Sequence, residues 1–432
     1  MKRLTNILLA LLLTTTLSAQ TAQEEIRANK YLAGSNYLDY DRQLSTQPLT
    51  PAPKGYVPFY LSHYGRHGSR YMSKMLEYDK LFDVLQQGER MHVLTPLGED
   101  VLQRVTAVRK EAEGRLGELT PLGREQMQMI AKRMMERFPE VFEGAVTVDA
   151  RSTLYSRCIL SMEYSLLQMV KMNPRLNIVS DASTSDLAVL SFNDRELMQN
   201  ILADDARKAF DAYCRSKACW QRVVGQLFTD TAFVNSRIDG ERLNYYLFRM
   251  ASNIQNMEVR KQLTFYDLFT DEEIYMNWQA TNAYWFMGYG YTSLNGNKQP
   301  FMQRALLRRI ISDADSCLKL KHPGATLRFG HDTVLLPLVC LMGLNGYGKS
   351  IRDLNYLEKR GWVDYRVFPM AANVQIVFYR KSPGDSDVLL KVLLNENEAT
   401  LPLPSNKAPY YRWSDFKEYY TKLLDSFEEN EQ

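Results

Sequence analysis

Arginine and histidine gather in one short segment, residues 63–70, which reads HYGRHGSR. Arg66 and Arg70 lie on either side of His67, and the glycines among them let the backbone approach a ligand closely. The planar guanidinium group of arginine matches two phosphate oxygens at once, and an imidazole held between two such groups can attack the phosphorus that they bind. The segment therefore indicates chemistry of the phosphoryl-transfer type.

A second basic segment, residues 151–157, reads RSTLYSR and follows a short β-branched run at 146–148. Arg157 is expected in or near the first turn of the next helix. The free N–H groups of a helix N-terminus attract anions, so an arginine added there makes a phosphate receptor. Taken alone, Arg157 is interpreted as a solvated surface arginine, and only its combination with residues 63–70 favours a binding role.

A third segment, residues 328–333, reads RFGHDT and lies between an expected strand and an apolar helix. Asp332 alone could simply cap that helix. Beside the other two segments, His331 could bind a phosphate group and Asp332 could protonate a leaving oxygen. Three strand ends would then converge on one site.

The elements that must position these residues follow from hydrophobic patterning and helix-start signals. Thr95-Pro96 and Thr120-Pro121 each place an N-cap before a proline at the first helical position. Strand and helix segments alternate, which predicts an α/β fold with a largely parallel central sheet and helices on both faces. Ligands of such sheets bind beyond the carboxyl ends of the strands. The expected strands are at 57–61, 146–148, 325–329, 374–379 and 388–394, and the expected buried helical positions include Met127, Ile130, Ala131, Met134, Phe138, Ile159, Met162, Leu166 and Val170.

The texture of the chain changes to mostly helical stretches between residues 181 and 299. This range is predicted to be an inserted helical cap. The α/β core would then comprise residues 20–180 and 300–432.

The first residues have the pattern of a signal peptide. Lys2 and Arg3 precede an apolar stretch at 7–13, and small residues follow near Ala19, so residues 1–19 are predicted to direct export to the periplasm or beyond. The apolar stretch is too short to span a bilayer, and no membrane span is expected. The formal net charge of +3 with no run of five like charges does not favour nucleic acid as a partner. Five cysteines without a C-x-x-C pair suggest no zinc site, and they leave both a local disulfide and buried free thiols open.

Taken together, the three segments resemble the histidine acid phosphatases, the branch of the histidine phosphatase superfamily that includes phytases. The resemblance covers nearly the whole chain after residue 19, and residues 119–126 (LTPLGREQ) also resemble a stretch of that family. It implies an exported hydrolase of small phosphomonoesters, with phytate or other inositol polyphosphates among its substrates and no metal or cofactor. It further implies that His67 is the nucleophile of a phosphohistidine intermediate, that Asp332 protonates the leaving alcohol and then assists water, and that the phosphate is held by Arg66, Arg70, Arg157 and His331.

Some positions depart from the family pattern and bear on the substrate. Tyr71 stands where a small residue followed by proline is more usual, which could reshape the pocket entrance. Residues 331–333 read HDT, where related inositol polyphosphate phosphatases usually carry HAE. Two alternatives are a non-catalytic protein that captures phosphate esters and a mutase-type phosphotransferase; an intact nucleophile and proton donor argue against the first, and the leader and Asp332 against the second. Cationic candidates for further phosphate contacts in the insertion are Arg207, Lys208, Arg215 and Lys217.

Overall fold

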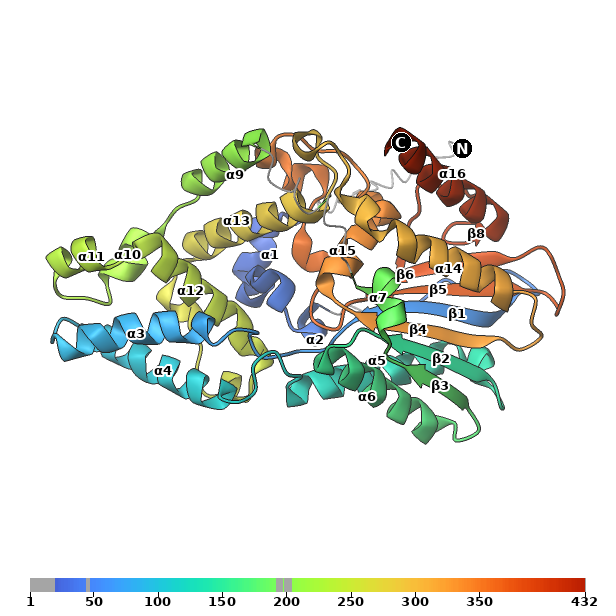
Figure 1. Ribbon diagram of the computed structural model, residues 1–432, viewed down its shortest axis with the longest axis horizontal. Coiled ribbons are helices and arrows are strands. Elements are labelled where there is room, and N and C mark those ends of the chain that lie inside the picture. The colour runs from blue at the N-terminus through green and yellow to red at the C-terminus, as the bar shows by residue number, and fades with distance from the viewer. Residues whose placement is uncertain (1–19, 44–46, 192–196, 198–203, 432) are drawn as a thin grey trace, which may run out of the picture.

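A mixed β-sheet forms the centre of one half of the molecule (Figure 1). The computed structural model describes residues 20–43, 47–191, 197 and 204–431. The sheet has eight strands in the order β3-β2-β4-β1-β5-β6-β7, with β8 paired to β6. The strands are β1 (Val57–Arg66), β2 (Thr147–Ser152), β3 (Asn177–Asp181), β4 (Gly324–Gly330), β5 (Asn373–Arg380), β6 (Leu389–Leu394), β7 (Asn397–Ala399) and β8 (Tyr411–Arg412).

The predicted parallel sheet is confirmed for the half that carries the chemistry. β3, β2, β4 and β1 run parallel, while β5, β6, β7 and β8 pair in the antiparallel sense. The antiparallel direction of β6 follows from its connection to β5, which is too short to contain a crossover helix. The fold is therefore α/β with an antiparallel extension on the side of β5.

Helices cover both faces of the sheet. On one face, α5 and α6 pack against strand residues such as Leu61, Val148 and Leu327, and on the other α14, α15 and α16 pack against Tyr60 and Tyr64. The helices are α1 (Ala22–Ala28), α2 (Tyr40–Gln43), α3 (Leu76–Arg90), α4 (Pro96–Ala112), α5 (Pro121–Arg137), α6 (Ser156–Met172), α7 (Leu187–Leu190), α9 (Asp204–Ser216), α10 (Trp220–Gly225), α11 (Thr231–Arg237), α12 (Gly240–Asn253), α13 (Asp271–Tyr289), α14 (Arg304–Cys317), α15 (Asp332–Leu341) and α16 (Trp413–Glu431).

The predicted helix starts are confirmed in detail. The hydroxyl of Thr95 accepts a hydrogen bond from the N–H of Gly98 at 3.1 Å, and that of Thr120 accepts one from Gly123 at 3.2 Å, each followed by proline at the first helical position. The methionine-containing stripe of α5 is buried as expected. In α6 two expected core positions were wrong: Val170 is exposed and Ile159 is only half-buried, because the buried stripe of α6 runs through Cys158, Ser161, Met162, Ser165, Leu166 and Met169.

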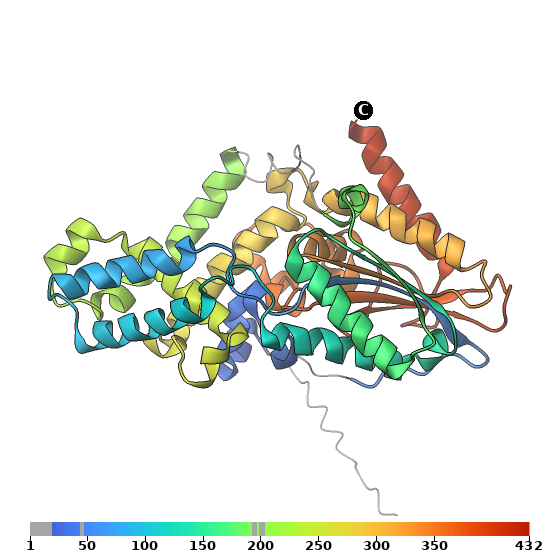
Figure 2. The same cartoon turned by 60° about the horizontal axis from the view of Figure 1, so that its bottom comes forward.

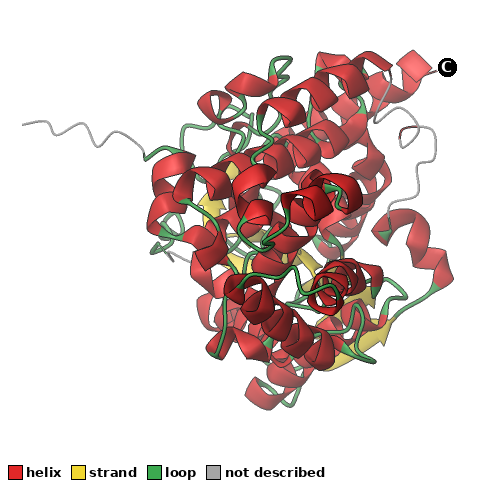
Figure 3. Cartoon of the chain, turned by 90° about the vertical axis from the view of Figure 1, so that its left-hand side faces the viewer, coloured by secondary structure: helices red, strands yellow, loops and turns green. Residues whose placement is uncertain are grey.

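A helical region lies beside the sheet and has a core of its own (Figures 2 and 3). It contains α10, α11, α12 and α13 from the predicted insertion, but α3 and α4 share the same hydrophobic cluster although they lie before it in sequence. The domain limits at 181 and 299 stay a prediction. The predicted signal peptide, residues 1–19, lies outside the described residues. Within the described ranges, no helix combines the length and the apolar character needed to cross a bilayer.

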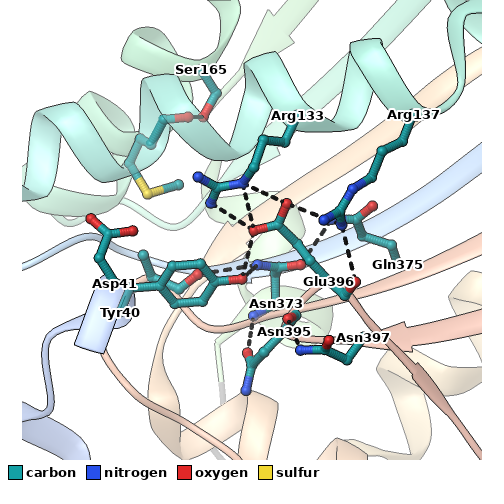
Figure 4. A network of polar contacts seen from close by, with 12 residues as sticks. Tyr40, Asp41, Arg133, Arg137, Ser165, Asn373, Gln375, Asn395, Glu396 and Asn397 are labelled. Carbon is teal, nitrogen blue, oxygen red and sulfur yellow. Dashed lines mark hydrogen bonds and ion pairs between the residues drawn. The ribbon is translucent and has the colours of Figure 1, made fainter. Parts of the chain in front are cut away.

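A buried carboxylate ties the sheet to α5 and to the segment before β1 (Figure 4). Glu396, in the turn between β6 and β7, is fully buried and receives hydrogen bonds from Arg133 at 2.7 Å and from the hydroxyl of Tyr40 at 3.0 Å. Arg137 donates to its backbone oxygen at 3.0 Å. The amide of Asn373 in turn donates to the hydroxyl of Tyr40 at 2.9 Å. The network fixes Glu396 in a backbone conformation with φ of +63°.

Replacing Glu396 by glutamine should lower the free energy of unfolding by about 3 kcal/mol, because the change leaves two largely buried arginines without their counter-charge. Urea denaturation followed by circular dichroism measures the loss. The matched control is Glu136→Gln, which removes an exposed pair with Lys132 on α5 and should leave the midpoint unchanged. Equal midpoints for the two variants would contradict a stabilising role for the network.

Candidate active site

Three parallel strands deliver the predicted segments to one end of the sheet. β1 ends at Arg66, directly opposite Gly330 at the end of β4, and β2 ends at Ser152, opposite Phe329. The backbone N–H of His67 donates to the carbonyl of Gly330 at 3.0 Å. The carboxyl ends of neighbouring parallel strands meet at one edge, which is why segments far apart in the sequence converge here.

The loop that follows β1 is held by its backbone. The N–H of Gly68 donates to the hydroxyl of Ser161 on α6 at 3.1 Å, and the N–H of Ser69 donates to the side chain of Gln126 on α5 at 2.9 Å. A Cβ atom at Gly68 would lie 2.4 Å from the carbonyl oxygen of Gly123, so only glycine lets the loop pack this closely on the first turn of α5.

The buried imidazole of His67 has a fixed tautomer. Its Nδ1 lies 2.9 Å from the carbonyl oxygen of Gly68. A carbonyl oxygen can only accept, so Nδ1 carries the proton and Nε2 of the neutral ring keeps a free lone pair. Burial and the charges of Arg66, Arg157 and Arg70 together hold the pKa of His67 well below its ordinary value. His67 is therefore available as a neutral nitrogen nucleophile in mildly acidic conditions.

The predicted arginines surround this ring. Arg66 is fully buried, donates to the carbonyl oxygens of Asn36 and Phe368 at 2.7 Å each, and lies 2.8 Å from the carboxylate of Asp332. Among the residues that the structure describes, neither Arg70 nor Arg157 has a carboxylate partner, and the Nε atoms of both lack a hydrogen-bond acceptor. Two largely buried cations without a carboxylate partner in this part of the chain favour the binding of an anion between them.

Arg157 takes the predicted place at the second position of α6, where its guanidinium lies 4.6 Å from the ring centroid of Tyr155. His331 is the N-cap residue of α15, and its ring centroid lies 5.7 Å from that of His67. The hydroxyl of Thr153 lies 3.3 Å from Nε2 of His331. All six predicted site residues are thus brought together.

The two remaining titratable groups, His331 and Asp332, differ in their starting charge. Burial and the nearby Arg157 lower the pKa of His331 to about 4. Burial by itself would raise the pKa of Asp332, but Arg66, Asn36 and Arg70 outweigh it and lower that pKa to about 2. In the free protein at pH 5 to 7, therefore, the histidines are neutral and Asp332 is ionised.

Asn36 is a site residue that the sequence did not reveal. Its side-chain amide donates to Oδ2 of Asp332 at 3.0 Å, from a 3₁₀ segment, η1 (Lys30–Tyr37), that is distant in sequence. An isolated asparagine in a polar lead-in carries no periodic or motif signal. The expectation that Tyr71 reshapes the pocket entrance was wrong. Its ring is buried in the core of the helical region, away from the cavity, and its hydroxyl donates to Glu111.

A cavity of about 640 Å³ opens from Arg70 and Asp332 toward the helical region. Of the four cations proposed in the insertion, Lys217 lines this cavity and the other three, Arg207, Lys208 and Arg215, are exposed and do not. The cysteines of the described chain are all free thiols, including Cys214 and Cys219. Aromatic side chains line part of this cavity, among them Tyr37, Phe210, Tyr245, Tyr284 and Trp285.

A family model for the histidine phosphatase superfamily, branch 2, matches residues 65–395. The chain belongs to this family. As a member of the histidine phosphatase superfamily it is a phosphatase that hydrolyses phosphomonoesters. A sequence relative is multiple inositol polyphosphate phosphatase 1 of Gallus gallus, 23% identical over 333 residues, which covers 73% of this chain and 72% of the relative.

Solved structures share the fold. The multiple inositol polyphosphate phosphatase of Bifidobacterium longum in complex with phosphate superimposes with a TM-score of 0.77 at 18% identity, covering 90% of this chain and 97% of the other. The phytase from D. castellii gives a TM-score of 0.67 at 14% identity, covering 95% and 88%. The fold expected from the sequence is therefore that of the family.

Proposed function

We propose that this histidine phosphatase hydrolyses phosphomonoesters through a phosphohistidine on His67, with Asp332 as proton donor. The observation that carries the proposal is the neutral Nε2 of His67 among three guanidinium groups, of which Arg70 and Arg157 have no carboxylate partner in the described chain. A bound phosphate group would supply the missing counter-charge. It would also set its phosphorus in front of the imidazole.

In the first step, Nε2 of His67 attacks phosphorus as the bond from phosphorus to the ester oxygen breaks. The arginines stabilise the charge on the three equatorial oxygens, and His331 adds a hydrogen bond to them. Asp332 gives its proton to the departing oxygen, which leaves as an alcohol. The products of this step are the alcohol, phosphohistidine and ionised Asp332.

The second step frees His67 and returns a proton to Asp332, and the enzyme regains its starting state when that proton leaves with inorganic phosphate. Ionised Asp332 accepts a proton from water while the water oxygen attacks phosphorus and the bond to Nε2 breaks. Because Asp332 is ionised in the free enzyme, the proton for the first alcohol must arrive with the substrate. A phosphomonoester has its second pKa at about 6, so the monoanion that prevails in mild acid can supply it.

Inositol polyphosphates are the substrates that we propose, with phytate among them. The name of the Gallus gallus relative supports this choice, and Lys217 offers one cation for a phosphate group beyond the one being cleaved. We further propose that the protein works in the periplasm or outside the cell, on the basis of the leader pattern in residues 1–19.

The ring of His67 should stay neutral when the free enzyme is titrated from pH 7.5 down to 4.5, because burial and the three arginines oppose protonation. Nitrogen NMR of the histidine rings follows this, with His67→Ala used to assign the signal. A protonation midpoint of His67 anywhere between pH 4.5 and 7.5 would contradict the electrostatic part of the mechanism.

The test of the function is release of inorganic phosphate from an aryl phosphate and from phytate between pH 4 and 7.5, with no metal added. We expect release from both esters and none from the His67→Ala variant. Release that survives in the variant would refute the nucleophile. Release from the aryl ester alone would refute phytate as a substrate and leave the phosphatase chemistry in place.

A further inference from the structure

A strained turn carries Asn36 to the proposed proton donor. Ser35 in η1 has φ of 54° and ψ of −121°, a backbone conformation that residues with a side chain rarely adopt. Such strain persists only where the surroundings hold it, and it gathers at functional sites. The turn has a direct consequence for the next residue, because it sets the direction in which Asn36 leaves the backbone.

The surroundings that hold Ser35 are a set of buried hydrogen bonds. The hydroxyl of Ser35 donates to Oδ2 of Asp364 at 2.5 Å, and the indole N–H of Trp278 on α13 donates to Oδ1 of the same carboxylate at 2.9 Å. The backbone N–H of Asp364 donates to Asn282, also on α13, at 3.0 Å. Trp278 and Asp364 are fully buried and Ser35 is 1% exposed. Burial in a low-dielectric setting makes each of these bonds costly to break.

What the turn holds in place is the carboxylate of Asp332. Its Oδ2 receives the amide of Asn36 at 3.0 Å and lies 2.8 Å from Arg66, while Oδ1 accepts the backbone N–H of Thr333 at 2.9 Å. Arg66 also donates to the carbonyl oxygen of Asn36 at 2.7 Å. Both oxygens of Asp332 are therefore oriented, and Asn36 contacts two members of the site at once.

We propose that Asn36 is a positioning residue for the proton donor, and that Ser35, Asp364 and Trp278 form a clamp that aims it. The clamp connects α13, a helix that lines the cavity, to the carboxylate that handles the leaving oxygen. The inference rests on the proposed function, in which Asp332 protonates that oxygen. It assigns a functional role to the 3₁₀ segment that precedes β1.

The chemistry gives Asn36 a measurable signature. Removal of its amide takes away one of the two groups that hold Oδ2 of Asp332, while Arg66 keeps its ion pair with that oxygen and the backbone carbonyl of residue 36 to which it donates. Proton transfer requires the donor within hydrogen-bond reach of the leaving oxygen, so a misplaced Asp332 harms esters that need the proton. An activated aryl oxide departs without one and should be affected far less.

The experiment measures kcat/KM of Asn36→Ala on an alkyl phosphate, glycerol phosphate, and on p-nitrophenyl phosphate. We expect a fall of about 10-fold or more on the alkyl ester and less than about 3-fold on the aryl ester. Asp364→Asn, which cannot accept from both Ser35 and Trp278, should change the ratio in the same direction. Asn173→Ala is the structural control: it removes three hydrogen bonds near the end of α6 and should leave the ratio unchanged.

The outcomes distinguish failure of the positioning role of Asn36 from failure of the proton-donor role of Asp332. Equal losses on the two esters in Asn36→Ala, or no loss, would overturn the positioning role if Asp332→Asn does discriminate between the esters. If Asp332→Asn slows the two esters equally, Asp332 is not the proton donor, and both that part of the proposed function and the inference about Asn36 are refuted. If Asp364→Asn does not fold, the result for Asn36→Ala still decides, because Asn36 lies outside the clamp.

Discussion

The His67→Ala variant should lose turnover by at least about 10⁴-fold and keep its affinity for inorganic phosphate within about 3-fold. The loss is expected because Nε2 of His67 is the group placed to attack a phosphorus held by Arg70 and Arg157. The affinity should survive because the guanidinium groups and His331 remain, and because the neutral ring adds no charge to the site. Phosphate release gives the turnover, and isothermal titration with inorganic phosphate gives the dissociation constant.

A labelling experiment separates a nucleophile from a general base. Brief reaction with a substrate labelled in the phosphate group, followed by alkaline quench, should leave label on the wild-type chain and none on His67→Ala. The exposed His322 provides the matched control, since His322→Ala should be labelled like the wild type. Label retained in His67→Ala would place the covalent step on another residue. If His67→Ala loses turnover but the wild-type chain also carries no label, direct attack by water on the phosphorus would be favoured.

Signals that act over a few residues were readable from the sequence. The N-caps Thr95 and Thr120 satisfy N–H groups three residues ahead, so their pattern lies within one turn of chain. The expected position of Arg157 at the start of α6 is also confirmed, and it followed from the short β-branched run before this residue and the helical periodicity after it. The convergence of three segments followed from a general property of parallel strands, whose carboxyl ends share one edge.

The direction of the strands beyond β1 in the sheet was harder to predict from the sequence. The strand character of β5 and β6 was clear from their residues, but alternation with helices indicated only a largely parallel sheet and did not say which strands would be antiparallel. The short connection between β5 and β6 decides the antiparallel direction, and the pairing of β5 with β1 is a long-range choice of the folded chain. Strand patterns specify burial and only weakly specify partners.

The contribution of the segment before β1 could not have been predicted. Asn36 meets Asp332 across 296 positions of sequence, and one hydrogen bond leaves no periodic trace in either segment. A glycine at position 35 would have signalled a left-handed turn, but the chain uses serine, whose hydroxyl is needed for Asp364. The strain is therefore hidden by the very side chain that holds it.

The Asp332→Asn variant should lower kcat/KM for alkyl phosphates by about 10²- to 10⁴-fold and that for p-nitrophenyl phosphate by less than about 10-fold. Asparagine has the shape of aspartate but carries no transferable proton, so an alkoxide would have to leave unprotonated. The value of kcat/KM reports the steps through formation of phosphohistidine, so slower hydrolysis of the intermediate does not enter the comparison.

Asp332→Asn also removes the counter-charge of Arg66, and this loss should strengthen the binding of phosphate while turnover of alkyl esters falls. The site gains one net positive charge, so inorganic phosphate should bind more tightly to Asp332→Asn than to the wild type. Tighter phosphate binding together with a selective loss on alkyl esters would identify Asp332 as the acid, because damage to the phosphate seat weakens binding and slows both esters alike. Parallel losses on the two ester types would instead show that Asp332 acts by holding Arg66, and the proton would have to come from elsewhere in the site.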